Sequence, residues 1–379
     1  MEPDETPTPA AEPESEVALA APPANTPLST PVEPSGAGWI FFGEDGLRSG
    51  WSLAIFTPLM ILLSGAIGAA MLALHLIDQK GHQGALSSLL GELIPFLGLV
   101  GAAAIVALVE QRRGNLLAFN LIGPHRVRHF FTGIGAGFVA LSALIGGLKA
   151  GGWITLTTAT WTMPELVRNA ALWGGAFLLV GCFEEGMFRC YLQATITRGI
   201  NLWWAIGWQA VLCGLLLTRS KGTEGWGVYA IALLGLAPCT WLHLRQAESA
   251  GFWQAAWITS SLFGFVHTSN NGENWIGIFA AAAIGFVFCV SVRLTGSAWW
   301  AIGFHAAWDW TETFFYGTAD SGMAAQGSYL AAKPDGNVLF SGGADGPEGS
   351  LLVIAVILLL LVALIAAYGR GLRTPRPSL

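Results

Sequence analysis

The sequence contains few charged residues: they make up only 11% of its 379 positions, while hydrophobic residues make up 53%. A soluble protein carries roughly a quarter charged residues. This deficit excludes an ordinary soluble globular protein. Cysteine is also scarce, with five residues that all lie in apolar runs and form no CxxC pair. We interpret them as small core residues, neither disulfides nor thiolate metal ligands. They are Cys182, Cys190, Cys213, Cys239 and Cys289.

Basic residues are missing from positions 1–37, which hold seven acidic residues and nine of the 18 prolines. Such a segment cannot bury enough apolar surface to fold, so we expect a disordered arm without a catalytic role. It also lacks the basic start and compact apolar core of a signal peptide.

Long hydrophobic runs are what the sequence does contain. A transmembrane helix needs about 20 mostly apolar residues, and the 17 tryptophans suit two membrane interfaces. We predict an all-α polytopic membrane protein, a bundle of about 8–10 transmembrane helices with a polar intramembrane site. The expected spans are 52–77, 86–109, 129–150, 170–192, 201–218, 227–243, 275–293, 297–316 and 350–368, with a shorter tenth helix at 252–268.

Basic residues in loops predict the orientation. Loop 110–128 and the C-terminal segment 369–379 are both rich in arginine, so we expect both on the cytoplasmic side together with the N-terminus. Arg219 and Lys221 then fall on the outer side, against this trend. The last span carries no charge and is interpreted as a plain anchor. The glycine-rich loop before it, 317–349, is long enough to be either flexible or functional.

Three charged residues, Glu184, Glu185 and Arg189, interrupt the apolar segment 170–192. A charge at bilayer depth costs at least about 2.5–3.5 kcal/mol, so such residues are rare and usually functional. Two other spans carry polar residues at helical spacing. His267 follows Phe263 by four positions, and Asp309 follows His305 by four.

Each of these groups also has a structural interpretation. Glu185 and Arg189 can form an ion pair on one helix face, and the carboxylate of Asp309 can fix the tautomer of His305. Glu184 would still lack a partner, and three separate explanations are needed for neighbouring spans. We therefore favour a shared site. Glu92, His75 and His243 lie near span ends and are interpreted as interface residues, while Glu312 fits either class.

Two glutamates, an arginine, two histidines and an aspartate suit a hydrolytic site. A carboxylate in an apolar pocket can act as a general base on water, and histidine donors can stabilise an oxyanion. Alternatively, His267, His305 and a carboxylate can hold a divalent metal with an open position for water. The residues alone do not separate these two chemistries.

The ordered motifs EExxxR (184–189), FxxxH (263–267) and HxxxD (305–309) resemble those of the CPBP family, also called Abi. This family contains the CAAX prenyl protease 2 and bacteriocin-processing intramembrane endopeptidases, including lysostaphin resistance protein A-like proteins. The resemblance covers about residues 170–316. It implies that Glu184 activates the attacking water, supported by Glu185 and Arg189. The last motif more often ends in asparagine, so Asp309 is a departure.

The resemblance further implies that His267 helps to place the water and that His305 and Asp309 shape the oxyanion side. We expect an intramembrane endopeptidase that cleaves a membrane-associated peptide or protein. The sequence leaves open whether this substrate is prenylated or otherwise lipid-anchored. No cofactor is favoured. The alternatives are a zinc metalloprotease that uses His267 and His305 as ligands, and a non-enzymatic transporter or scaffold. The latter is disfavoured because no internal repeat is evident.

The expected partners are the lipid bilayer and the substrate, with no nucleic acid, and the expected location is a multi-pass position in a bacterial inner membrane. The expected division of the chain is a disordered acidic tail (1–37), N-terminal transmembrane helices (38–169), a catalytic core (170–316), the glycine-rich loop (317–349) and a C-terminal anchor with a basic tail (350–379).

Overall fold

The computed structural model describes residues 38–43, 46–77, 84–110, 119–200, 202–219, 237–245, 249–270, 272–324 and 326–369. The acidic tail and most of the predicted span 227–243 lie outside the described residues, as do the C-terminal arginines and Lys221.

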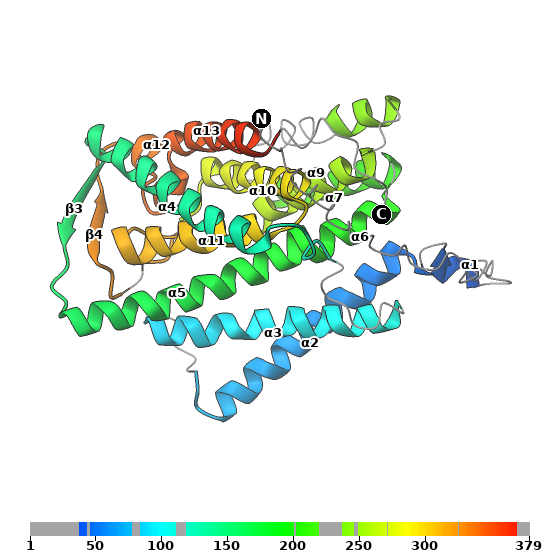
Figure 1. Cartoon of the computed structure of the whole chain (residues 1–379), viewed down its shortest axis with the longest axis horizontal. Helices are drawn as coiled ribbons and strands as arrows, with labels where there is room; N and C mark the ends of the chain where they lie inside the picture. Colours follow the sequence, from blue (N-terminus) through cyan, green and yellow to red (C-terminus); the bar gives the residue numbers. More distant parts are fainter. Residues whose placement is uncertain are drawn as a thin grey trace, which may run out of the picture.

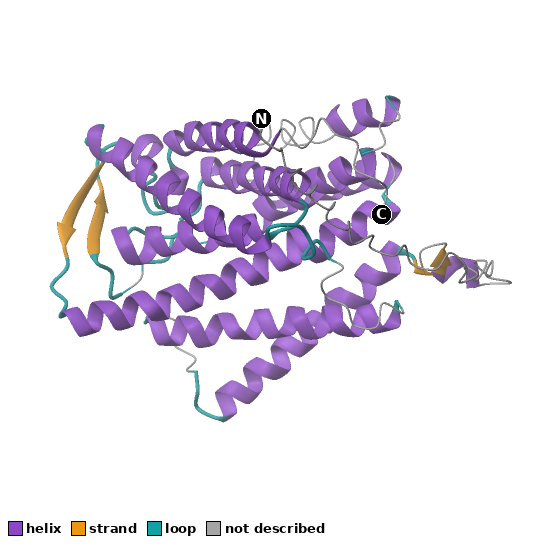
Figure 2. Ribbon diagram, in the orientation of Figure 1, coloured by secondary structure: helices purple, strands orange, loops and turns teal. Residues whose placement is uncertain are grey.

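The described chain is almost entirely helical (Figures 1 and 2), with η2 and η3 of the π type and η4 of the 3₁₀ type. In order, the elements are α1 (Gly38–Phe41), β1 (Phe42–Gly43), β2 (Gly46–Leu47), α2 (Ser49–Ala73), α3 (Ala85–Val109), α4 (Arg126–Ala150), β3 (Ile154–Thr158), α5 (Met163–Glu185), η2 (Gly186–Leu192), α6 (Gln193–Gly199), α7 (Leu202–Arg219), α9 (Ala250–His267), α10 (Trp275–Thr295), α11 (Trp299–Trp310), η3 (Thr311–Tyr316), β4 (Leu330–Pro334), α12 (Val338–Ser341), η4 (Pro347–Gly349) and α13 (Leu351–Tyr368).

Six helical runs in the described residues are long and apolar enough to cross a membrane: α2, α3, α4, the continuous run α5–η2–α6, α10 and α13. Their bounds follow the predicted spans closely, except that the run through α5 extends over 37 residues. The helices α7, α9 and α11 coincide with three further predicted spans. The prediction of an all-α polytopic membrane protein is confirmed.

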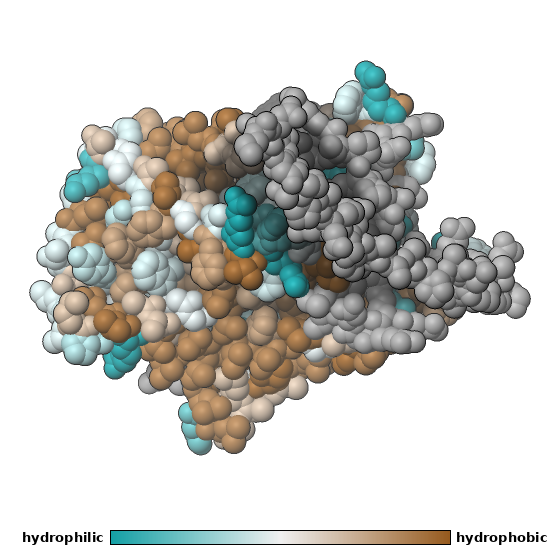
Figure 3. Space-filling model, viewed as in Figure 1, coloured by the Kyte–Doolittle hydropathy of each residue, from teal (hydrophilic) through white to brown (hydrophobic). Residues whose placement is uncertain are grey.

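Large apolar side chains are exposed on the outer helices, as expected for contact with lipid. Leu62 on α2, Leu108 on α3 and Leu359 on α13 are 69%, 61% and 70% exposed. Figure 3 shows the apolar surface over α2 and α3 in the lower part of the view. The bilayer is therefore a partner of this surface.

The two arginine-rich segments begin at the same end of the bundle. Thr132, near the start of α4, lies 2.9 Å from the hydroxyl of Tyr368 at the end of α13, and Arg198 at the end of α6 pairs with Glu110 at the end of α3. The opposite end carries the antiparallel pair β3–β4, in which Ile154 is aligned with Pro334 (Figure 2). The segments that flank loop 110–128 and the end of α13 thus lie on one side, as the orientation prediction requires.

Helices α4 and α11 approach closely at glycines. A Cβ added at Gly133 would lie 2.2 Å from the carbonyl oxygen of Trp300, and one at Gly303 would lie 2.2 Å from that of Phe130. Because a side chain at either position would collide with backbone, only glycine permits this contact. The contact places α11, which carries His305 and Asp309, in the centre of the bundle.

The loop 317–349 contains regular secondary structure. Its strand β4 pairs with β3, and the following α12 and η4 return the chain to the start of α13. Among the described residues, the thiols of Cys182, Cys190, Cys239 and Cys289 are free. The side chain of Cys213 lies outside the described part of the structure.

Candidate active site

The motif residues come from three separate helical segments. Helix α5 begins at a capping box formed by Thr162 and Glu165, which satisfies the first backbone donors of the helix. It ends at Glu185, and the chain continues as the π-helix η2, which carries Arg189. A π-turn widens the helix and often occurs at functional sites. A second π-helix, η3, follows α11 directly after the HxxxD motif.

Glu185 is completely buried and contacts two other motif residues, His305 and Arg189. Its Oε1 lies 2.9 Å from Nδ1 of His305, and the same oxygen accepts a hydrogen bond of 3.3 Å from Nη1 of Arg189. Its Oε2 lies 3.2 Å from Nε of Arg189. The carboxylate therefore fixes His305 across 120 positions of sequence while its charge is neutralised by the arginine.

Arg189 is also fully buried, and aromatic rings surround its guanidinium group. The group lies 4.3 Å from the ring centre of Phe263 and 5.3 Å from that of Phe288. A Cβ added at Gly285 would lie 2.4 Å from Nη2 of Arg189. Cation–π contacts stabilise a buried guanidinium group. This packing explains the phenylalanine of the FxxxH motif, and it identifies Gly285 as a position that leaves room for the arginine.

Glu184 faces a cavity instead of the ion pair. Its side chain is 26% exposed, and its Oε2 lies 3.7 Å from Nε2 of His305. The same nitrogen lies 3.6 Å from Oδ2 of Asp309. His305 is thus held by a short contact at Nδ1, while its Nε2 faces two carboxylates at longer range.

The tautomer of His267 follows from its surroundings. Its Nδ1 lies 2.7 Å from the carbonyl oxygen of Phe263. A carbonyl oxygen can only accept a hydrogen bond, so Nδ1 carries the proton and Nε2 of a neutral ring carries the lone pair. The free nitrogen can accept a proton of water or bind a metal.

A cavity of about 340 Å³ brings four of the six predicted site residues together. Glu184, His267, His305 and Asp309 line it, and Glu185 and Arg189 lie behind its wall. Its apolar walls are formed largely by α5, α9, α10, α11 and α13, including Trp173, Phe177, Phe263, Val266, Ala280, Ala281, Ile284, Phe288, Phe304, Val353, Val356, Ile357 and Leu360.

The cavity also contains polar residues that the sequence analysis did not assign to the site. Glu92 on α3, interpreted from sequence as an interface residue, lines the cavity, and so do Thr313, Asp320 and Glu348. The interpretation of α13 as a plain anchor is also incomplete, because Val353 and three further residues of this helix line the cavity. Glu92 is a single acidic residue near the end of a span, so the sequence could not distinguish it from an interface residue. Asp320 and Glu348 lie in the loop 317–349, where no helical spacing relates them to the motif residues.

His267 and His305 are not part of a cluster of described side chains that could together bind zinc. Within the described residues, the group of three side chains whose ligand atoms all lie within 4.8 Å of one another is Glu312, Asp320 and Glu348. Neither histidine belongs to it. Nδ1 of His305 is engaged by Glu185, and its Nε2 lies 3.7 Å from Glu184. In this arrangement the two histidines do not fit a catalytic zinc site, which needs three protein ligands around one ion and an open position for water.

Comparison with protein-family models finds a match. Residues 166–246 and 239–311 match the family model described as Type II CAAX prenyl endopeptidase Rce1-like. The matched region contains all three motifs and confirms the resemblance noted in the sequence. It also supports a peptide hydrolase of the CAAX type. No curated protein and no solved structure matches the chain.

Proposed function

We propose that Glu184 activates the water that cleaves the peptide bond, since residues 166–246 and 239–311 match the family model of Rce1-like type II CAAX prenyl endopeptidases. The observation that carries this proposal is the position of Glu184. It is the exposed member of the glutamate pair, it lines the cavity, and His305 lies beside it at 3.7 Å. Glu185, fully buried against Arg189, is shielded from water.

The proposed reaction begins with a water held between Glu184 and Nε2 of His267, both of which line the cavity. The carboxylate of Glu184 takes a proton from the water, whose oxygen bonds to the carbonyl carbon of the substrate. The tetrahedral oxyanion collapses, the carbon–nitrogen bond breaks, and Glu184 returns the proton to the leaving amine. No further reactant is needed for this balance.

His305 is the proposed donor to the oxyanion. Its Nδ1 donates to Glu185, and as an imidazolium it also presents an N–H at Nε2 toward the cavity. A donor held in a site of low dielectric stabilises a developing negative charge strongly. Asp309, 3.6 Å from the same nitrogen, orients the ring. Glu185 and Arg189 act as positioning residues, since they touch His305 or Glu185 and not the cavity.

The proposed substrate is a membrane-associated peptide that carries a long apolar group, such as a prenyl chain on cysteine. The support is the apolar lining of the cavity, to which α10 contributes Ala280 and Ile284 and α13 contributes Val353 and Leu360. Apolar pockets with a few placed polar groups are typical of ligand sites. The proposed location is a bacterial inner membrane. The family match favours this enzyme over the transporter or scaffold alternative.

The test uses the full chain in nanodiscs and fluorogenic peptides that end in a prenylated cysteine followed by three residues, with unprenylated copies for comparison. Glu184→Gln should reduce the cleavage rate by at least about 10²–10⁴-fold, because the nearly isosteric amide cannot accept a proton. Thermal unfolding should remain unchanged.

Glu165→Gln, at the exposed start of the same helix, is the matched control and should retain the cleavage rate. If Glu184→Gln cleaves a peptide at the wild-type rate, the proposed role of Glu184 is wrong.

A further inference from the structure

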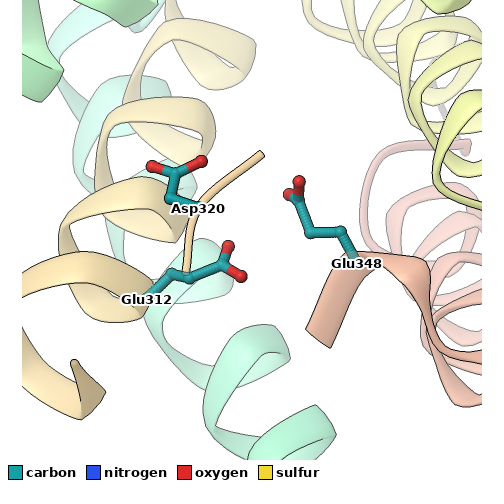
Figure 4. A group of neighbouring side chains, drawn as sticks. All are labelled: Glu312, Asp320 and Glu348. Carbon is teal, nitrogen blue, oxygen red and sulfur yellow. The ribbon is translucent and has the colours of Figure 1, made fainter. Parts of the chain in front are cut away.

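Three carboxylates that the three motifs do not include meet at one edge of the cavity (Figure 4). Glu312 belongs to η3, Asp320 to the loop that follows, and Glu348 to η4 just before α13. One oxygen from each lies within 4.8 Å of the others. Asp320 and Glu348 also line the cavity. The three side chains thus connect both ends of the loop 317–349 to the end of the helix that carries His305.

Glu312 has no visible source of stabilisation. Its side chain is 0% exposed, and neither carboxylate oxygen has a hydrogen-bond partner among the residues that the structure describes. The other two carboxylates accept hydrogen bonds: Thr313 donates to Asp320 at 3.1 Å, and the indole N–H of Trp308 donates to Glu348 at 2.7 Å. A buried carboxylate without a partner costs several kcal/mol, so the side chain of Glu312 points to a missing ligand.

Charge balance leads to the same conclusion. Among the described residues, no lysine or arginine forms an ion pair with any of the three acids. The charges of the three acids are therefore not offset by a paired lysine or arginine within the described residues.

We propose that Glu312, Asp320 and Glu348 form a binding site for a hard divalent cation, with Ca²⁺ as the preferred ion. All three donors are carboxylate oxygens, the ligands that Ca²⁺ and Mg²⁺ prefer, whereas zinc sites usually include nitrogen or sulfur. Mg²⁺ keeps several waters and is usually held by only one or two carboxylates, so a site of three carboxylates favours Ca²⁺.

The site is distinct from the zinc alternative at His267 and His305, and it does not depend on the proposed hydrolytic role of Glu184. Its function is structural. A cation bound by η3, the loop and η4 fastens the cavity wall that Asp320 and Glu348 form. Without the cation, mutual repulsion of the three charges loosens this wall.

Terbium luminescence tests the site directly, because Tb³⁺ replaces Ca²⁺ and is sensitised by a nearby indole. Trp308, hydrogen-bonded to Glu348, is such an indole. The full chain, purified in detergent and stripped with EGTA, should bind one Tb³⁺ with sensitised emission. Ca²⁺ should displace the Tb³⁺ at lower concentration than Mg²⁺. Ca²⁺ alone should also raise the melting temperature.

Glu312→Gln should weaken Ca²⁺ and Tb³⁺ binding by more than about 100-fold, since loss of a ligand exceeds the 10–100-fold effect of losing an outer-shell partner. In EGTA the same variant should melt at a higher temperature than the wild type, because one buried charge is gone. Asp320→Asn provides an independent test of binding should Glu312→Gln express poorly. Glu273→Gln is the matched control. It removes a half-buried acid that lies outside the three-carboxylate group and accepts a hydrogen bond from Asn270, and binding should persist.

The proposal is wrong if the stripped wild type binds neither Tb³⁺ nor Ca²⁺, since protons would then neutralise the three acids. It is equally wrong if Glu312→Gln and Asp320→Asn bind both ions as tightly as the wild type.

Discussion

Nδ1 of His305 lies 2.9 Å from Oε1 of Glu185, although 120 positions separate them in the sequence. The other oxygen of Glu185, Oε2, forms an ion pair with Nε of Arg189 at 3.2 Å. The two glutamates of the EExxxR motif therefore differ in their surroundings: one faces the cavity, and the other fixes a histidine. The different roles of the two glutamates lead to the first prediction.

Glu185→Gln should lower kcat by about 10²–10³-fold, the usual cost of losing an oriented donor to an oxyanion. KM should change little, because Glu185 lies behind the cavity wall and does not contact the substrate. The pH dependence of kcat should change as well, since Glu185 touches the ring of His305. Steady-state kinetics between pH 5 and 9 measure kcat, KM and the pH dependence of kcat.

Asp309→Asn is the companion variant. In the wild type, Oδ2 of Asp309 lies 3.6 Å from Nε2 of His305, beyond hydrogen-bond distance. Asparagine is the residue more common at this position of the family motif. We expect less than about a tenfold loss of kcat. Equal losses in the two variants would contradict the separate role of Glu185.

Arg189→Leu should destabilise the protein by about 3–5 kcal/mol, because it leaves the fully buried carboxylate of Glu185 without its counter-charge. Abundance in the membrane and thermal unfolding of the purified protein measure the effect. Arg168→Leu, on an exposed position of α5, is the control and should change stability by no more than about 0.5 kcal/mol. A wild-type melting temperature in Arg189→Leu would show that the pair is dispensable.

Chelators should separate the two kinds of metal chemistry. A zinc-selective chelator such as 1,10-phenanthroline should leave the cleavage rate unchanged if Glu184 acts without zinc. EGTA, which removes Ca²⁺, should lower the melting temperature through the proposed carboxylate site. If phenanthroline abolishes cleavage, zinc restores it, and His267→Ala or His305→Ala loses one bound zinc, the metalloprotease alternative is correct.

The contact between Glu273 and Asp345 predicts a pH dependence of stability. Burial, and then the charge of Asp345, raises the pKa of Glu273 to about 8, and burial raises the pKa of Asp345 to about 6. The folded state holds these protons more tightly than the unfolded chain does. Their contribution to stability is therefore full below about pH 4 and is lost as the pH rises to about 8.

Melting temperatures measured from pH 4.5 to 8.5 should fall less in Glu273→Gln than in the wild type, because the variant cannot ionise at this position. The nearby acid Glu348 remains in both proteins and serves as the common background. Parallel curves for the two proteins would refute the assignment.

The sequence by itself determined the fold class and the contacts within each helix. Long apolar runs have few ways to satisfy their backbone polar groups in a membrane other than helix formation. Glu185 and Arg189, or His305 and Asp309, lie four positions apart, so one helical turn brings each pair together, and the structure has them at 3.2 Å and 3.6 Å.

Only the tertiary structure decided which of these helices meet and which atoms face one another. The contact of Glu185 with His305 depends on the packing of α5 against α11, and the ring of Phe263 reaches Arg189 from α9. Glu92 and the acids of the loop 317–349 reach the cavity through the path of the chain after η3 and the placement of α3. No local period encodes such long-range contacts, because they depend on how side chains of distant segments fill a common space.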